Sequence, residues 1–247
     1  MIREILRTTV APVIGRLVPA LHFNSLAYLR HSARRLEHLA SLRIPVAGKT
    51  VLEVGAGIGD HSHYYLDRGC RITITDARES NLKTVRRRFP DADVRALDLE
   101  APPVEFPGGP WDIIHCYGLL YHVRDPESAL RIMGRHCREM LLLETCVSFG
   151  DEQRINPIDE CKGSPTQAFS GGGCRPTRSW VWHRLHEHFS HVYLPMTQPN
   201  HAEFPLDWRA PEQHRAALSR AVFVATREPL VHPLLTSEIP HLQTRHE

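Results

Sequence analysis

The sequence has little of what marks several common protein classes. No pair among its six cysteines has CxxC spacing, and Cys116 and Cys146 lie in apolar, strand-like runs, so free thiols in a reducing cytoplasm explain them better than a disulfide framework. The formal net charge is only +2, which speaks against a nucleic-acid partner, because such partners are bound through basic surfaces. The 17 histidines are scattered without metal-ligand spacing, and no metal site is predicted from them.

Long apolar runs are missing as well. Within the first 21 residues, Arg7, Pro12, Arg16 and Pro19 interrupt every apolar stretch. That segment therefore fits neither a transmembrane helix nor a signal peptide, and a weakly membrane-touching amphipathic segment stays an open alternative. We expect a cytoplasmic protein without a transmembrane segment. The oligomeric state is left open.

The sequence does contain a regular alternation of short apolar strands and helical segments. An amphipathic helix is expected over residues 24–40, with Arg34 and Arg35 on its solvated face. Strands are expected at residues 50–54, 71–75, 94–96, 111–116, 140–145, 191–194 and 220–226. Helices are expected from about residue 60 to Gly69 and at residues 79–89, 126–137 and 179–189. This rhythm predicts an α/β fold with a doubly wound, mostly parallel sheet whose last strand is antiparallel.

The same pattern suggests how the chain is divided. Residues 1–46 form an N-terminal helical extension, residues 47–228 the main domain, and residues 229–247 a loose tail. The strand–helix rhythm fails at residues 148–178 and again at residues 195–215, where glycine, proline and polar residues gather. Long irregular segments in a compact domain are usually lids or binding loops, so we expect these two segments to form a substrate cap.

The sharpest motif is a glycine turn that follows the first strand, Val-Gly-Ala-Gly-Ile-Gly-Asp at residues 54–60. A strand, a glycine turn and a helix in this order let a ligand approach the backbone closely. The spacing is GxGxG and not the GxGxxG of dinucleotide sites, and Asp60 stands where that pattern needs glycine or alanine. Glu53 adds a negative charge beside the turn, which suits a cationic ligand and opposes a pyrophosphate. A dehydrogenase is therefore disfavoured.

With these residues the sequence resembles the class I S-adenosylmethionine (SAM)-dependent methyltransferases over about residues 49–145. The resemblance implies a Rossmann-like fold, SAM as the methyl donor and S-adenosylhomocysteine (SAH) as the product. It places Glu53 and the glycine turn along the methionine part of SAM, Asp76 on the ribose hydroxyls and Asp98 near the adenine amino group. The cofactor-binding residues that it implies are Glu53, Gly55, Ala56, Gly57, Gly59, Asp76, Ala77, Asp98, Leu99, Tyr117 and Gly118.

The loop after the fourth strand is where this family usually places residues that face the acceptor. It contains Leu120, His122, Asp125 and Pro126, which looks like the family's frequent Leu-x-His-x-x-Asp-Pro pattern. His122 is the candidate general base, which is needed only if the nucleophile arrives protonated. The alternative is that His122 orders the loop or packs on the cofactor.

Other residues are candidates for the wall of the acceptor pocket. Glu144 and Cys146 end the fifth strand, at the edge where open α/β sheets bind ligands. Tentative substrate-binding residues are Tyr121, Glu144, Cys146, Trp180, His201 and Trp208. A metal site built from His201, Glu203 and Asp207 is conceivable, but no metal is expected.

The function predicted from these features is methyl transfer from SAM to a small-molecule acceptor, with a hydroxyl oxygen of a natural product or sugar as first choice. The balanced charge and the long cap favour such an acceptor. A tRNA-modifying SAM-dependent enzyme is an alternative that the missing basic stripe disfavours. A catalytically inactive SAM-binding scaffold is a second alternative, made less attractive by the intact loop after the fourth strand.

Overall fold

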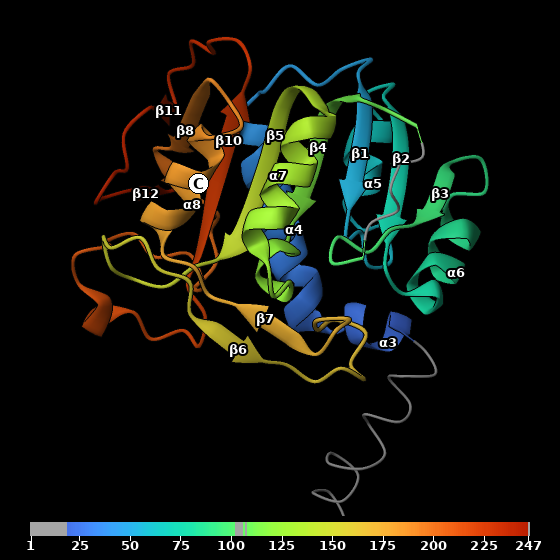
Figure 1. Cartoon of the computed structure of the whole chain (residues 1–247), viewed down its shortest axis with the longest axis horizontal. Coiled ribbons are helices and arrows are strands. Elements are labelled where there is room, and N and C mark those ends of the chain that lie inside the picture. The colour runs from blue at the N-terminus through green and yellow to red at the C-terminus, as the bar shows by residue number, and fades with distance from the viewer. Residues whose placement is uncertain (1–18, 102–105, 107, 247) are drawn as a thin grey trace, which may run out of the picture.

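The computed structural model describes residues 19–101, 106 and 108–246 (Figure 1). The amphipathic segment considered within residues 1–21 thus falls almost entirely outside the described residues. Across the described part of the chain, no helix is both long and apolar enough to cross a membrane.

Within the described residues, eight strands form one sheet that is parallel on one side and antiparallel on the other. Its order is β11-β8-β10-β5-β4-β1-β2-β3, and the strands from β5 to β3 run parallel, whereas β10 runs antiparallel to both β5 and β8. The strands are β1 (Thr50–Val54), β2 (Arg71–Asp76), β3 (Asp93–Ala96), β4 (Trp111–Tyr117), β5 (Cys137–Cys146), β8 (His191–Pro195), β10 (Arg220–Thr226) and β11 (Leu235–Thr236). The predicted mostly parallel sheet with an antiparallel strand over residues 220–226 is confirmed.

Helices cover both faces of this sheet. In Figure 1, α7 lies in front of the central strands and α4 behind them. The helices are α3 (Pro19–Phe23), α4 (Leu26–Ser41), α5 (Ser62–Leu66), α6 (Glu79–Arg88), α7 (Pro126–His136) and α8 (Arg178–His186), with short 3-10 helices η2 (Leu120–His122) and η3 (Pro211–Gln213). Helix α5 is shorter than the predicted helix, which was expected to run from about residue 60 to Gly69. Side-chain caps fix the start of α4, α7 and α8; at α7, Asp125 Oδ1 accepts a hydrogen bond from Ser128 N at 2.9 Å.

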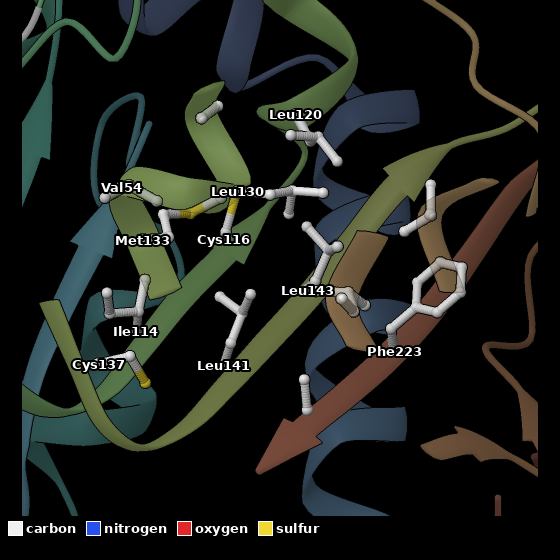
Figure 2. Packing of buried hydrophobic residues seen from close by; sticks show 14 of the residues in the cluster. Val54, Ile114, Cys116, Leu120, Leu130, Met133, Cys137, Leu141, Leu143 and Phe223 are labelled. Carbon is white, nitrogen blue, oxygen red and sulfur yellow. The ribbon is translucent and has the colours of Figure 1, made fainter. Parts of the chain in front are cut away.

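Successive residues of the central strands point to opposite faces, which creates two hydrophobic cores. Leu141 and Leu143 of β5 belong to the core beneath α7 and α8, where they pack with Leu130 and Met133 of α7 (Figure 2). Met140 and Leu142 belong to the core beneath α4, α5 and α6. The same alternation brings the polar residues Glu53, His115, Glu144 and Arg220 to the α4 face, near the carboxyl ends of the parallel strands.

The cap and the tail are more ordered than the sequence suggested. Within residues 148–178, β6 (Pro157–Asp159) pairs antiparallel with β7 (Gly172–Cys174). This β6–β7 hairpin and α3 lie below the sheet in Figure 1, at the edge toward which the parallel strands point. The tail is not loose: β11 extends the sheet beside β8, and β12 (Thr244–Arg245) pairs with β9 (Thr197–Gln198). The loose tail was wrongly predicted, because its strands are only two residues long and have no period to detect.

Candidate active site

A cavity of about 480 Å³ opens at the carboxyl ends of the parallel strands. Helices α3 and α4, the turns after β1, β2, β3 and β4, the β6–β7 hairpin and the segment before β10 all contribute to its wall. The predicted site residues that line it are Gly55, Gly57, Asp76, Ala77, Asp98, Leu99, Tyr117, Gly118, Tyr121, His122 and His201. The structure therefore brings most of the predicted cofactor residues and the candidate base together in one space.

The glycine turn uses a backbone that other residues rarely adopt. Gly55, Gly57 and Gly59 have φ angles of +67°, +59° and +80°, in the region that favours glycine. A Cβ on Gly57 would lie 2.7 Å from the Phe23 ring, so the backbone at this point is in close contact with α3. Gly59 does not line the cavity. A Cβ there would lie 2.7 Å from Phe89, so Gly59 permits packing of the turn against the end of α6.

Asp76 ends β2 at the cavity wall, and its carboxylate is fixed by three donors. Oδ2 accepts from Gly57 N at 2.9 Å, and Oδ1 accepts from Arg78 N at 2.8 Å and Asn81 Nδ2 at 3.1 Å. Burial raises the pKa of Asp76 to about 6 despite these hydrogen bonds. At pH 7 the group is mostly an anion whose remaining lone pairs can accept hydroxyl hydrogens.

Asp98 and Leu99 follow β3 on the same wall of the cavity. Asp98 Oδ1 accepts a hydrogen bond from Glu100 N at 3.0 Å, which holds the turn after β3. The adjacent Leu97 and Leu99 are buried and belong to the core. This turn thus offers a carboxylate, and an apolar surface suited to a flat ring.

Glu53 lies behind the glycine turn and does not line the main cavity. Together with Ala56 it lines a separate recess of about 20 Å³, which is room for about one water molecule. Its Oε2 accepts from Ser62 Oγ at 2.5 Å, and burial raises the pKa of Glu53 to about 7. The sequence predicts that Glu53 and Ala56 contact the cofactor. In this geometry, a ligand in the main cavity would not touch them directly.

Arg35 is a cavity residue that the sequence analysis missed. The guanidinium is 4 % exposed and donates to Glu144 Oε2 at 3.0 Å, so the solvated position expected for Arg35 is wrong. It lies directly over Gly118, where a Cβ would come within 3.0 Å of Arg35 Nη1. Its Nε is buried without a hydrogen-bond partner among the described residues. The sequence does contain a signal for this burial. Arg35 is at helical spacing from Ser32 and Leu39, and all three lie on the buried face of α4.

The loop after β4 presents Tyr121 and His122 to the cavity. Their rings lie 3.9 Å apart between centroids. Nδ1 of His122 lies 2.5 Å from Oε2 of Glu160, a residue of the β6–β7 hairpin. Burial lowers the pKa of His122 below its ordinary value, although the hydrogen bond with Glu160 acts in the opposite direction. A neutral imidazole at neutral pH is the form that a general base requires.

Charged and polar groups from α4, β10 and the segment after β9 meet at the other end of the cavity. Arg220 donates to Glu203 Oε2 at 2.6 Å, to Glu144 Oε1 at 3.0 Å and to Tyr121 Oη at 3.1 Å. His31 and His201 line the cavity beside Glu203, and their rings lie 4.9 Å apart between centroids. These groups can orient a polar acceptor.

The metal site conceived from His201, Glu203 and Asp207 does not form. Asp207 pairs instead with Arg209 at 3.1 Å, whereas His31 joins His201 and Glu203, with ligand atoms within 4.8 Å of one another. Arg220 already donates a hydrogen bond to the Glu203 carboxylate. Burial is the largest cause of the lowered pKa of His31, and the charges of Arg35 and Arg220 lower it further. This positive surrounding disfavours a dication.

Four of the tentative acceptor residues do not line the cavity. Glu144 is fully buried between Arg35 and Arg220, and Cys146 is fully buried at the end of β5. Trp180 is a residue of α8 and is buried in the core that this helix covers. Trp208 stacks beneath Arg178, 3.9 Å from its guanidinium carbon, and donates from Nε1 to Gln243. Each was selected by its position near a strand end, in the cap or just after it, and packing turned each side chain away.

Comparison with known proteins agrees with the fold and the site. A family model described as "Methyltransferase domain" matches residues 26–193, which is more than half of the chain. The chain therefore belongs to this methyltransferase family, within the class I SAM-dependent methyltransferases.

Two curated relatives are both named ubiquinone biosynthesis O-methyltransferase. The protein from Pseudomonas paraeruginosa is 36% identical over 97 residues, which cover 38% of this chain and 41% of the relative. The protein from Caulobacter vibrioides is 31% identical over 130 residues, which cover 49% of this chain and 50% of the relative. The matched part thus spans half or less of the length of these relatives.

Solved structures share the fold. The N-terminal domain of EvdMO1, determined in the presence of SAH and D-fucose, has a TM-score of 0.60 at 19% identity, covering 80% of this chain and 83% of that domain. A SAM-dependent methyltransferase from Mesorhizobium loti has a TM-score of 0.57 at 16% identity, covering 80% of this chain and all of that protein. These likenesses concern the architecture alone.

Proposed function

We propose that this protein transfers the methyl group of SAM to a hydroxyl oxygen of a small-molecule acceptor. The observation that carries the proposal is that the glycine turn with Asp76 and the imidazole of His122 line the same cavity. One end of that space has the features of a SAM site, and the other end carries a base and polar side chains.

The residues present fit SAM. Gly55 and Gly57 allow a ligand to approach the backbone, and Asp76 offers a fixed carboxylate for the ribose hydroxyls. The guanidinium of Arg35, whose Nη1 lies beside Gly118 and whose Nε has no hydrogen-bond partner among the described residues, is a counter-charge for the carboxylate of the methionine part. When bound, SAM supplies an electrophilic methyl group on a positively charged sulfur. The chain's own contribution is to hold the acceptor in line and to exclude water, which lowers a barrier by roughly 7–11 kcal/mol in favourable cases.

His122 supports an oxygen acceptor. A hydroxyl must lose its proton as it attacks, and a base with a lowered pKa is ready to accept that proton at neutral pH. The names of the curated relatives, which are O-methyltransferases, support the same direction. A cavity of about 480 Å³ that must also contain SAM leaves room for a small molecule.

The first test is ligand binding measured by calorimetry. SAH and SAM should release heat on titration into the protein, and NADH should not. Asp76→Ala should weaken SAH binding by about 1–3 kcal/mol, because the ribose loses its acceptor. Asp91→Ala, which removes an exposed carboxylate just before β3, is the matched control and should bind as the wild type does. An NADH response, or unchanged SAH affinity in Asp76→Ala, would contradict the assignment.

The second measurement follows the methyl group. Protein incubated with methyl-labelled SAM and a cell extract should transfer label to small molecules and not to RNA. His122→Asn should lower that transfer about 100-fold or more, as expected for loss of a general base, while SAH affinity is retained. Label recovered in RNA would overturn the small-molecule acceptor.

A further inference from the structure

The β6–β7 hairpin places one carboxylate directly against the candidate base. Glu160 follows β6, and its side chain is only 2 % exposed. Oε2 lies 2.5 Å from His122 Nδ1 and accepts from Ala168 N at 2.7 Å. Oε1 lies 3.4 Å from Arg175 Nη2. Residues 38 positions apart are thus joined in a partly buried contact, and the backbone of the hairpin fixes the carboxylate.

This contact determines which nitrogen of His122 carries hydrogen. Burial by itself would raise the pKa of Glu160, but the hydrogen bond from His122 and the charge of Arg175 hold that pKa below its ordinary value. The group is therefore an anion that only accepts hydrogen bonds, and Nδ1 must donate to it. In a neutral ring Nε2 then has the free lone pair. Among the residues that the structure describes, none forms a hydrogen bond with His122 Nε2, and the ring lines the cavity.

We propose that Glu160 is a positioning residue that fixes the ring orientation and the tautomer of His122, so that Nε2 faces the acceptor as an unprotonated base. This inference rests on the proposed function, in which His122 accepts the hydroxyl proton. The cap then takes part in the chemistry, because the base is complete only when the β6–β7 hairpin is docked on the loop after β4.

The reaction balances with these groups alone. The acceptor oxygen forms its bond to the methyl carbon as its proton passes to His122 Nε2. The electron pair of the methyl–sulfur bond remains on sulfur, which becomes a neutral thioether. The imidazolium that results is stabilised by the anionic Glu160 and later releases its proton to solvent. Glu160 itself stays ionised throughout.

The charged and titratable groups around His122 come from three places. Glu160 and Arg175 belong to the hairpin side, Arg220 to β10, and the Tyr121 ring lies against the His122 ring at a tilt. Glu160 raises the pKa of His122, whereas burial and the two arginines lower it. Removing the Glu160 charge should therefore lower the pKa of His122 further. The base would stay neutral, but its tautomer would no longer be fixed.

The test is nitrogen NMR of histidine-labelled protein without ligands. His122→Asn identifies the His122 signals by their loss. In the wild type, His122 should give a protonated-type Nδ1 signal and an unprotonated-type Nε2 signal at neutral pH. In Glu160→Gln this distinct pair should be lost, because the amide can donate to Nδ1 as well as accept from it, and the titration of His122 should shift to lower pH. Asp159→Asn, which alters the exposed neighbouring carboxylate on β6, should leave the pair intact.

The outcomes separate this inference from the proposed function. Calorimetry with SAH should show that Glu160→Gln still folds and binds. An unchanged His122 signal pair in Glu160→Gln overturns the positioning role even if His122 is the base. Full methyl transfer by His122→Asn would instead remove the base role, while a tautomer change in Glu160→Gln would still show that Glu160 controls the ring. In the labelled-SAM assay, Glu160→Gln should lower methyl transfer at least about tenfold. The decrease is smaller than for loss of His122, because only part of the contribution of the base is removed.

Discussion

The two ends of the cavity are built in different ways. At the cofactor end, the glycine turn, Asp76 and Asp98 each lie at or just after the end of a strand, so the contacts that fix them are made largely within and between neighbouring turns. At the acceptor end, Tyr121, Glu144, Glu203 and Arg220 come from four separate parts of the chain and are held by one set of ion pairs and hydrogen bonds.

The difference shows where specificity can change. A site made of short turns depends on backbone conformation, which substitutions elsewhere in the chain leave intact. A site made of distant side chains depends on each partner in the set, because the others are then left buried without a counter-charge. We therefore expect the acceptor end to be more sensitive to substitution of a single partner than the cofactor end.

The largest effect is expected at Glu144. Its carboxylate is fully buried and ion-paired with Arg35 and Arg220 at 3.0 Å each, and it has a lowered pKa because these two charges outweigh the cost of burial. Glu144→Gln leaves two buried guanidinium groups without their shared anion, and should lower the free energy of unfolding by about 3–5 kcal/mol. Urea unfolding at pH 7 measures this change.

The control is a pair with the same chemistry at the surface. Lys49 and Glu139 lie 2.6 Å apart but are 34% and 47% exposed, and Glu139→Gln should cost less than about 1 kcal/mol. If Glu144→Gln cost no more than Glu139→Gln, the acceptor end would not depend on its buried ion pairs, and the contrast between the two ends would fail.

A smaller effect is expected from Glu53 behind the glycine turn. Burial raises its pKa to about 7 in the folded protein, above the value of about 4.3 in an unfolded chain. The folded state then binds more protons, so this group lowers stability as the pH rises from about 4 to about 7, by up to about 3 kcal/mol. In Glu53→Gln, the free energy of unfolding should fall less between pH 5.5 and pH 8 than in the wild type.

Urea unfolding at several pH values checks this expectation. Glu37→Gln, at an exposed helix position, should keep the pH dependence of the wild type. An identical pH slope in Glu53→Gln would mean that Glu53 is ionised in the folded protein, as expected if it faced a cationic ligand directly.

The same contrast explains how far the sequence could be interpreted. The strands, the turn at Gly55 and Gly57, and the position of Asp76 follow from local patterns and were predicted, because each depends on residues close in the chain. Arg35 and Glu160 were not identified, since their roles depend on partners 109 and 38 residues away. Glu144 was identified by its place at a strand end, but sequence alone does not show that two arginines enclose it.

The smallest expected effect concerns Trp208, which joins the cap to the tail. Its Nε1 donates to Gln243 Oε1 at 2.7 Å, and Gln198 Nε2 donates to the same oxygen at 2.9 Å. Trp208→Phe keeps a ring over Arg178 and removes one of the two donors, so the free energy of unfolding should fall by only about 1 kcal/mol. Trp182→Phe is the matched control, because Trp182 Nε1 has no partner among the described residues and its loss should cost less.

SAH affinity and methyl transfer should be unchanged in Trp208→Phe, since the side chain does not line the cavity. A decrease in methyl transfer with unchanged stability would instead place Trp208 in the acceptor wall, where its position in the sequence first suggested it.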